Sequence, residues 1–357
     1  MQTSMKTFTI LSLLVLTFFQ NQIIYGQINN SEKAEVAERQ NFRIMFYNTE
    51  NLYDSKDDSL VNDDEFTPFG IRHWTYEKMM IKLQHTAKAL LAGMEWNTAA
   101  LIGMCEVENS YVIKKLIYET PLSSLHYRYL HRDSPDKRGV DVCLLYDPGQ
   151  FTPMKVQFIS IRYPFDMAST TRDILYVKGV VGENDTLHVF VNHWPSRFGG
   201  YLQTMAKRNF VAGCLRDKVD SLFINDSCAS IVIMGDFNDE PGDESIAKIL
   251  KATDEQDTIK SAGLYNLMAA LKKKWWKGSH KFGNDWGILD QFIVSGSLLT
   301  RKTGMMTALS DATIVDASFL FTEENNKPGR KPFRTYAGPR YLGGYSDHLP
   351  IRLDLHY

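Results

Sequence analysis

The chain has 357 residues, of which 44% are hydrophobic and 23% are charged. This is the composition of an ordinary globular protein, and it excludes a chain that is disordered throughout. The formal net charge of -2 provides no overall basic field, so a polyanionic substrate would have to be held by a local group of basic residues.

The N-terminus has the layout of a secretory signal peptide. Lys6 precedes an apolar stretch, Phe8–Phe19, and polar residues then lead to the small residue Gly26. About a dozen apolar residues are too few to cross a bilayer, so we expect cleavage, export to an extracytoplasmic location and no stable membrane span. The chain is therefore divided into a signal peptide at 1–26, a polar segment at 27–40 and one domain at 41–357.

An apolar run, Phe42–Asn48 (FRIMFYN), predicts the first strand of this domain. The strand carries Asn48 to its end, and Glu50 follows two residues later. Asn48 is suited to a phosphate or to a metal-bound water, and Glu50 is suited to a divalent cation. The alternative is that both residues are only the polar part of a loop at the strand exit.

The next segments are an acidic loop and a helix. Residues 54–65 are rich in Asp and Glu but lack the spacing of a calcium-binding loop, so they are interpreted as solvated. Apolar residues then recur at helical spacing through Thr75–Met94, among them Met79, Leu83 and Leu90. This pattern predicts an amphipathic helix whose apolar face packs on a sheet.

A second buried strand is predicted over Ala99–Cys105 (AALIGMC), and it ends at Glu106. A carboxylate just beyond a buried strand is costly unless it meets a cation, a hydrogen-bond donor or water. Glu106 is therefore the first candidate for a magnesium ligand. Glu108 is expected to begin or cap the helix that follows through Leu116.

A third strand is predicted over Lys137–Tyr146, with Arg138 at its entry. Arg138 either contacts a substrate phosphate or is an ordinary surface charge. The strand contains Cys143, and the preceding one contains Cys105; both are interpreted as small buried thiols. The other two cysteines, Cys214 and Cys228, can pair in an oxidising compartment, although a disulfide is not the favoured interpretation.

A hairpin is predicted over Leu175–Val181 and Thr186–Val191. It is followed at once by the polar cluster Asn192–Arg197 (NHWPSR). Most histidines at strand ends are neither catalytic nor ligands, but the neighbouring Asn, Ser and Arg make His193 a candidate catalytic residue. Arg197 is the candidate in this cluster for binding substrate.

A helix is predicted over Gln203–Phe223, and a strand buried on both faces begins at Ile231. This strand runs into a Gly-Asp pair in the motif GDFND, which delivers Asp236 and Asn238 to the strand end. With Phe237 turned the other way, the carboxylate can orient or deprotonate a water while the amide donates to a phosphoryl oxygen. The alternative is a strand followed by an ordinary Asx-type turn.

The last two strands are predicted over Gly287–Ser295 and Ile351–Leu355. Asp290 lies inside the first of these between apolar residues, so its carboxylate needs a partner such as an imidazole. The motif Ser-Asp347-His348 just before the final strand offers such a partner. No internal repeat or linker follows residue 40, which is why one domain is assigned.

These motifs occur in an order that resembles the endonuclease/exonuclease/phosphatase superfamily. The resemblance extends from about Phe42 to Tyr357, and GDFND together with a terminal SDH is its specific part. It implies an α/β (α+β) fold, a four-layer α/β/β/α sandwich with two packed mixed sheets and a metal site where the strand-end loops meet. By motif position, Glu106 would bind magnesium, with Asn48, Glu50 and Asp347 as further ligands. Manganese or calcium are the alternative ions.

The resemblance also implies catalytic roles. His348, held by Asp290, would form an acid/base pair, and Asp236 would orient or deprotonate the attacking water. Asn238 would hold a phosphoryl oxygen, and His193 would donate to the phosphate or the leaving oxygen. Either carboxylate–imidazole arrangement can activate the water in such a site.

The function expected from the sequence is an exported Mg2+-dependent phosphodiester hydrolase, most simply a nuclease acting as a monomer on DNA or RNA without a protein partner. The alternative is a phosphatase or sphingomyelinase-like phospholipase, which would need an apolar membrane-contacting loop. The basic and aromatic run Lys272–Lys277 (KKKWWK) suits either function, or is a solvated helix end. A binding protein without catalysis is disfavoured because every expected acid, base and ligand type is present.

Overall fold

The computed structural model describes residues 41–255, 257–272, 278–324 and 329–357. The predicted signal peptide, the polar segment 27–40 and residues 273–277 of the basic aromatic run lie outside these ranges. Contacts between residues group Asn41–Tyr357 into one unit. Within the described ranges, no helix combines the length and apolarity that crossing a membrane requires.

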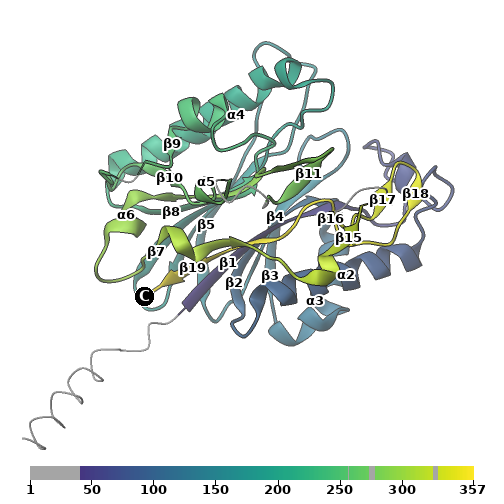
Figure 1. Ribbon diagram of the computed structural model, residues 1–357, viewed down its shortest axis with the longest axis horizontal. Coiled ribbons are helices and arrows are strands. Elements are labelled where there is room, and N and C mark those ends of the chain that lie inside the picture. Colours follow the sequence, from purple (N-terminus) through teal and green to yellow (C-terminus); the bar gives the residue numbers. More distant parts are fainter. Residues whose placement is uncertain (1–40, 256, 273–277, 325–328) are drawn as a thin grey trace, which may run out of the picture. The chain divides into compact units, whose positions relative to one another are not determined.

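Two large mixed sheets form the centre of this unit (Figure 1). Each sheet contains both parallel and antiparallel strand pairs. The first sheet has the order β14 (Ala312–Ile314), β19 (Ile351–His356), β1 (Asn41–Leu52), β2 (Ala99–Val107), β4 (Asp141–Tyr146) and β3 (Arg128–His131). The second has the order β5 (Phe151–Ile159), β6 (Ile174–Val181), β7 (Asp185–His193), β8 (Ser230–Asp236), β13 (Asp290–Ser295), β10 (Leu264–Asn266) and β9 (Ala252–Thr253).

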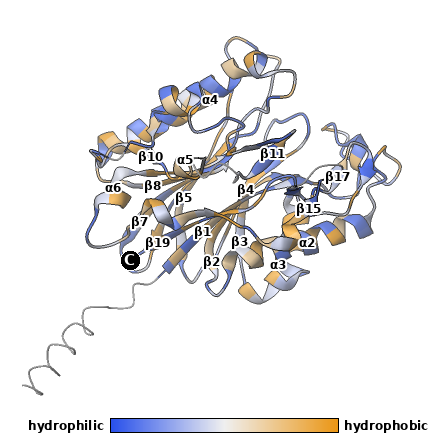
Figure 2. Ribbon diagram, viewed as in Figure 1, coloured by the Kyte–Doolittle hydropathy of each residue, from blue (hydrophilic) through white to orange (hydrophobic). Residues whose placement is uncertain are grey.

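The two sheets pack face to face through apolar side chains, and their strands carry mainly hydrophobic residues (Figure 2). β1 and β2 contact β8, and β4 contacts β7. The approach is closest at Gly103 of β2, where an added Cβ would lie 2.9 Å from the Met234 sulfur on β8. A side chain larger than glycine would therefore require Met234 to move at this point.

Helices cover the outer faces of both sheets. On the first sheet lie α2 (Tyr76–Met94) and α3 (Ser110–Tyr118), and on the second lies α4 (Tyr201–Asn225). The stripe of α4 that includes Val211 and Leu215 packs in one cluster with Ile231 on the outer face of β8. The predicted four-layer α/β/β/α sandwich is thus confirmed.

The long elements match their predictions closely, while short edge strands were not predicted. The helix predicted from Thr75 begins one residue later, because the Thr75 hydroxyl caps it by accepting from the amide of Lys78. Asn109, and not Glu108, caps α3. The edge strand β5 escapes a pattern-based prediction because its outer face is largely exposed and a register shift follows Pro153.

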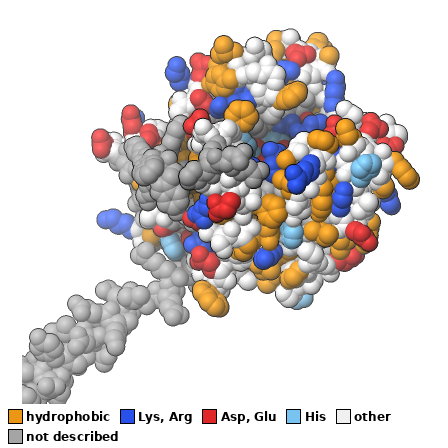
Figure 3. Space-filling view, turned by 45° about the vertical axis from the view of Figure 1, so that its right-hand side comes forward, with side chains coloured by type: hydrophobic (Ala, Val, Ile, Leu, Met, Phe, Trp, Pro, Cys, Tyr) orange, Lys and Arg blue, Asp and Glu red, His pale blue; other side chains and the backbone are white. Residues whose placement is uncertain are grey.

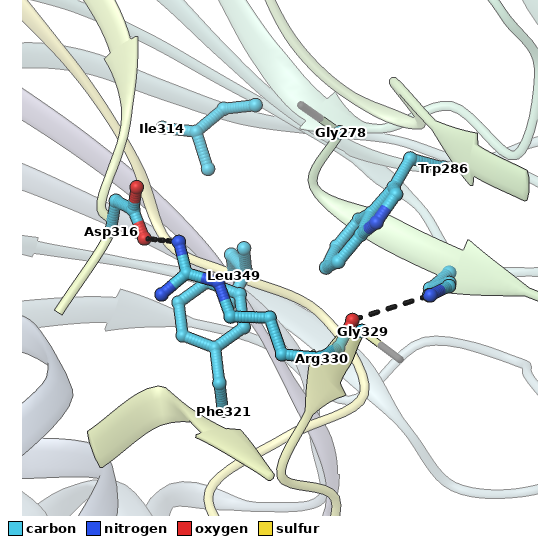
Figure 4. Close-up of a pocket in the computed structure, with 9 residues that line it drawn as sticks. Gly278, Trp286, Ile314, Asp316, Phe321, Gly329, Arg330 and Leu349 are labelled. Carbon is cyan, nitrogen blue, oxygen red and sulfur yellow. Dashed lines mark hydrogen bonds and ion pairs between the residues drawn. The ribbon is translucent and has the colours of Figure 1, made fainter. Parts of the chain in front are cut away.

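Three small hairpins lie beside the ends of the sheets. They are β11 (His280–Phe282) with β12 (Asp285–Gly287), β15 (Phe321–Glu323) with β16 (Arg330–Pro332), and β17 (Tyr336–Ala337) with β18 (Arg340–Tyr341). Lys281 ties the first two together, since its ammonium lies 2.9 Å from the Glu324 carboxylate and 3.3 Å from the Arg330 carbonyl oxygen. A small apolar pocket of about 220 Å³ remains between them, with Trp286 and Phe321 among its walls (Figure 4).

Candidate active site

The candidate catalytic residues meet where strands of both sheets end. Strand pairing places Asp236 of β8 opposite His193 of β7 on one side and opposite Asp290 of β13 on the other. The first sheet contributes Asn48 of β1, whose side-chain amide donates to Asp236 Oδ2 at 3.0 Å. This hydrogen bond joins the two sheets at the site. Residues far apart in the sequence are thus brought into one cluster by strand register within the second sheet and by packing of the first sheet against it.

Asp236 is the centre of this cluster. Its Oδ1 accepts from the backbone amide of Asn238 at 2.9 Å, and its Oδ2 faces two imidazoles. The Nε2 atoms of His193 and His348 lie 3.8 and 3.9 Å from Oδ2. These distances are too long for direct hydrogen bonds, so a single water or phosphoryl oxygen between the three groups could contact them all. Burial raises the pKa of Asp236 to about 6, which is a suitable range for a general base near neutral pH.

His348 is held by Asp290, and nearby carboxylates favour its protonated form. Its Nδ1 lies 2.7 Å from Asp290 Oδ2, and its backbone amide donates to the Ser346 hydroxyl at 3.1 Å. Burial on its own would lower the pKa of His348, but the nearby carboxylates of Asp290 and Asp236 raise it well above the usual value. The Nε2 atom therefore carries a proton that it can donate toward Asp236 and the substrate position.

His193 faces the same carboxylate in the opposite charge state. Burial lowers the pKa of His193 well below its usual value, and the positive charges of Arg172 and Arg138 lower it further. Arg172 is fixed beside it by Asp136 at 3.0 Å and by the Trp194 carbonyl oxygen at 2.8 Å. Two imidazoles, one neutral and one protonated, thus flank one buried carboxylate.

A second group of acidic side chains lies beside this cluster. Arg334 connects two of them, with its Nε 3.3 Å from Glu50 Oε1 and a terminal nitrogen 2.9 Å from Asp347 Oδ2. The charge of Glu106 acts on the same guanidinium. Burial raises the pKa of Glu50 to about 7, and the charge of Asp347 adds to this shift.

These acids fit a divalent cation. A protein cation, Arg334, already bridges Glu50 and Asp347, and oxygen donors are what Mg2+, Mn2+ and Ca2+ prefer. Among the described residues, ligand atoms of Asp236, Asp290 and His348 lie within 4.8 Å of one another, whereas those of Glu50, Glu106 and Asp347 do not form so close a group. Because Asp290 and His348 already share a short hydrogen bond, the acids beside Arg334 are the better candidate for the metal site.

Several of these residues occupy a strained backbone conformation. Glu50, Asn51, Glu106 and Asn238 all have positive φ angles between 49° and 58°. The pairing of β1 with β2 shifts register between Asn48 and Leu52, at the same place. Left-handed backbone at non-glycine residues is costly and concentrates at functional sites. The left-handed conformation of Asn238 also means that side chains do not simply alternate after Asp236, as was assumed when Asn238 was predicted to point the same way as Asp236.

The two predicted substrate-binding arginines have different surroundings. Arg138 lies at the site, since it donates to the Asn51 side chain at 2.6 Å and lies 3.6 Å from Glu106 Oε2. Arg197 instead donates to the Asn238 carbonyl oxygen at 2.6 Å and pairs with Asp243 at 2.6 Å. Arg197 therefore supports the GDFND loop, and Asp243 partly neutralises its charge.

Asn238, in the same loop, donates its side-chain amide to the Trp194 carbonyl oxygen at 3.1 Å.

Four basic or imidazole side chains at the site were not predicted: Arg172, described above, and Arg334, Lys82 and His280. The Lys82 ammonium is buried beneath the acids and donates to the Thr335 hydroxyl at 2.6 Å; burial lowers its pKa to about 8. The His280 ring lies against that of His348, with 4.6 Å between the ring centres. Lys82 follows Met79 by one helical turn, and a lysine on an apolar helix stripe is the one signal that could have been used.

Neither Glu108 nor any of the four cysteines was predicted to be catalytic. Glu108 accepts from the backbone amide of Asp54 at 2.6 Å, and burial raises its pKa to about 8. The four cysteines are free, so Cys214 and Cys228 do not pair in the structure. Cys105 lies beside Asp236 and His193, but burial raises the pKa of its thiol well above the usual value, which makes it inert.

Comparison with known proteins gives consistent results. A model of the Endonuclease/Exonuclease/phosphatase family matches residues 43–357. Truncated TDP2 from Caenorhabditis elegans is 15% identical, with a TM-score of 0.53 over 89% of this chain and 98% of that chain. An endonuclease/exonuclease/phosphatase family protein from Bacteroides thetaiotaomicron is 11% identical, with a TM-score of 0.52 over 90% of this chain and 99% of that chain.

A third similar structure is D. rerio TDP2 complexed with single strand DNA product. It is 12% identical, with a TM-score of 0.51 over 89% of this chain and 100% of that chain. At sequence identities this low, the structural similarities establish the fold alone. A search of curated protein sequences found no match.

Proposed function

Because the chain belongs to the endonuclease/exonuclease/phosphatase family, we propose that it is a Mg2+-dependent phosphodiester hydrolase that acts on nucleic acid outside the cytoplasm. Members of this family hydrolyse phosphoesters. The observation that carries the proposal is the convergence of neutral His193, protonated His348 and the buried Asp236 carboxylate beside a group of oxygen ligands. The extracytoplasmic location rests on the N-terminal sequence.

The arrangement suits an in-line attack of water on phosphorus. Asp236 accepts the proton of the water as the new O–P bond forms, and protonated His348 donates its Nε2 proton to the leaving oxygen as the old P–O bond breaks. His193 donates a hydrogen bond to a phosphoryl oxygen, where negative charge grows. Asp290 keeps the His348 imidazolium oriented throughout.

The metal would be held by Glu106, Glu50 and Asp347, with Asn48 beside them. When bound, a divalent ion neutralises charge on the phosphoryl oxygens and helps to orient them. The Asn48 side-chain amide donates to Asp236, and the Asn48 side-chain oxygen accepts from the backbone amide of Glu50 at 2.9 Å. Its contribution is therefore to hold Asp236 and the Glu50 loop in place.

A nucleic acid is favoured as the substrate by two observations. Arg138 lies beside Glu106 at the site, and Lys and Arg side chains border the hollow near the middle of the face shown in Figure 3. Basic groups of this kind bind phosphate backbones. The similar D. rerio protein was solved with a single strand DNA product. The lipid alternative depends on Trp275 and Trp276, which lie outside the described residues.

The direct test is to incubate the purified protein and Mg2+ with plasmid DNA, RNA, sphingomyelin and bis(4-nitrophenyl) phosphate. We expect cleavage of nucleic acid and of the diaryl ester, loss of both on chelation, and recovery when Mg2+ is added back. The expected loss is at least about a hundredfold, because the charge neutralisation supplied by the ion disappears. Cleavage of sphingomyelin alone would overturn the nuclease assignment, and no turnover of any substrate would overturn the enzyme assignment.

Arg334→Gln is expected to tighten Mg2+ binding by on the order of tenfold. The guanidinium is an internal cation on Glu50 and Asp347, so an incoming ion has to compete with it for the same oxygens. Calorimetric titration of Mg2+ into the wild-type and variant proteins measures this change without a substrate. Arg340→Gln, an exposed change on β18, is the control and should leave the affinity unchanged. An unchanged or weaker affinity in Arg334→Gln would contradict the competition.

A further inference from the structure

A pocket of about 410 Å³, lined by both charged and apolar side chains, opens beside Asp347. Its walls come from the β11–β12 hairpin, from β16 and from the segment that leads into β17. Arg334 and Asp347 line it, so it is continuous with the acids of the candidate metal site. Its volume falls in the range of small-ligand sites.

The β11 strand connects this pocket to the catalytic centre. His280 at its start lies against His348, with 4.6 Å between ring centres, and its backbone bridges that of His348. Phe282, two residues later, is on the same face of the strand because side chains alternate. Phe282 lines the pocket and is 83% exposed. A substrate that follows β11 outward from His348 would therefore enter the pocket and pass an exposed aromatic ring.

The charges in the pocket favour an anion. Three basic side chains line it, Lys281, Lys331 and Arg334, against the two carboxylates of Glu324 and Asp347. Lys281 is paired with Glu324 at 2.9 Å, and Arg334 with Asp347 at 2.9 Å. Within the part of the chain that the structure describes, Lys331 forms no ion pair. The Lys331 ammonium is therefore the positive charge in the pocket that is available to bind an anionic ligand.

We infer that this pocket binds the phosphate next to the scissile one, so that the substrate is a nucleic-acid strand with at least two phosphates. The inference rests on the proposed function and extends it. Lys331 provides the main contact to the flanking phosphate, and Arg334 adds a second one when it leaves Asp347. Phe282 stacks on the adjoining base, as aromatic side chains do in sites for single strands. A simple phosphomonoester would leave both groups unused.

The test compares thymidine dinucleotides that differ by one phosphate. TpT carries only the scissile group, pTpT adds a phosphate on the 5′ side, and TpTp adds one on the 3′ side. We expect one of the two longer compounds to be cleaved with a kcat/KM at least about tenfold above that of TpT, because a charge-assisted contact is added. The preferred compound also shows on which side of the scissile bond the pocket lies.

Variants assign the preference to the pocket. Lys331→Gln should lower kcat/KM by about tenfold on the preferred compound and by a smaller factor on TpT, so that the ratio collapses. Lys331→Glu should reverse the preference. Lys302→Gln, an exposed lysine outside the pocket, should leave the ratio as in the wild type. Thermal unfolding of each variant verifies that it is folded.

Two outcomes would overturn the inference. The first is equal kcat/KM for all three dinucleotides, and the second is a preference that Lys331→Glu leaves intact. Both require that the dinucleotides are cleaved, so they are distinct from failure of the proposed function. That failure would show as no cleavage of the dinucleotides, of long DNA or RNA, or of bis(4-nitrophenyl) phosphate.

Discussion

His348→Ala is expected to lower kcat by about a thousandfold, within the range for loss of a positioned general acid or base. Its Nε2 is the protonated group that faces Asp236 Oδ2 across 3.9 Å, and no other described imidazolium occupies that position. The measurement is kcat on a DNA oligonucleotide, whose alkoxide leaving group needs the proton, with thermal unfolding recorded in parallel. KM should change much less, because the lost proton is used in the transition state.

The structural cost of this change has to be separated from the catalytic one. Removing His348 leaves the Asp290 carboxylate buried without its partner, so the alanine variant is expected to be less stable. His348→Gln retains a polar group that can hydrogen-bond to Asp290 but cannot donate a proton, and it should be as inactive as the alanine variant. His126→Ala, at an exposed position, is the control and should retain wild-type kcat. Activity near the wild-type level in a folded His348→Gln protein would contradict the role.

The central part of the fold was predictable because long buried elements have strong local patterns. The helix through Met79 and Leu83, the hairpin before His193 and the strand from Ile231 were all recovered with small changes in their ends. The edge strand β5 and the small hairpins were not. Their residues are exposed or short, so neither periodicity nor burial distinguishes them from loops.

The same distinction applies to the candidate site. Asp236 and His193 could be assigned to strand ends because each follows a buried strand. Asp290 was predicted inside a strand and joined to the site only by the family resemblance, whereas in the structure it begins β13 opposite Asp236. No sequence pattern marks Arg334 in the same way, because its segment has the composition of an ordinary polar loop. Its contact with Glu50 joins residues that are far apart in the sequence. The left-handed backbone at Glu106 is likewise a product of tertiary structure and has no sequence mark.

The pKa values of the two histidines at the site shift in opposite directions because their neighbours differ. His348 has a direct contact of 2.7 Å with Asp290, and the carboxylates of Asp290 and Asp236 raise its pKa. His193 lies 3.8 Å from both Glu106 and Asp236, too far for a hydrogen bond, and burial together with two nearby arginines lowers its pKa. Burial raises the pKa of Asp236, but the positive charge of His348 opposes this shift. The site therefore offers one acid, one base and one neutral donor close together, which are the roles that phosphodiester hydrolysis divides among several groups.

Asp236→Asn is expected to lower kcat by about a thousandfold by removing the base that faces the attacking water. The variant also makes a second, independent prediction. The charge of Asp236 helps to raise the pKa of His348, so its removal should lower that pKa. The asparagine keeps the size of the side chain and can still accept from the Asn238 amide, although its own amide would face that of Asn48.

Both effects can be measured on one protein. Nuclear magnetic resonance of the His348 ring protons follows the pKa directly, and kcat on bis(4-nitrophenyl) phosphate follows the chemistry. Asp217→Asn, an exposed change on α4, is the matched control for each measurement. A lowered pKa with unchanged kcat would mean that Asp236 acts only on the charge of His348, and another group would then have to take the proton of the water. Loss of kcat with an unchanged pKa would instead mean that the charge of His348 depends on Asp290 alone.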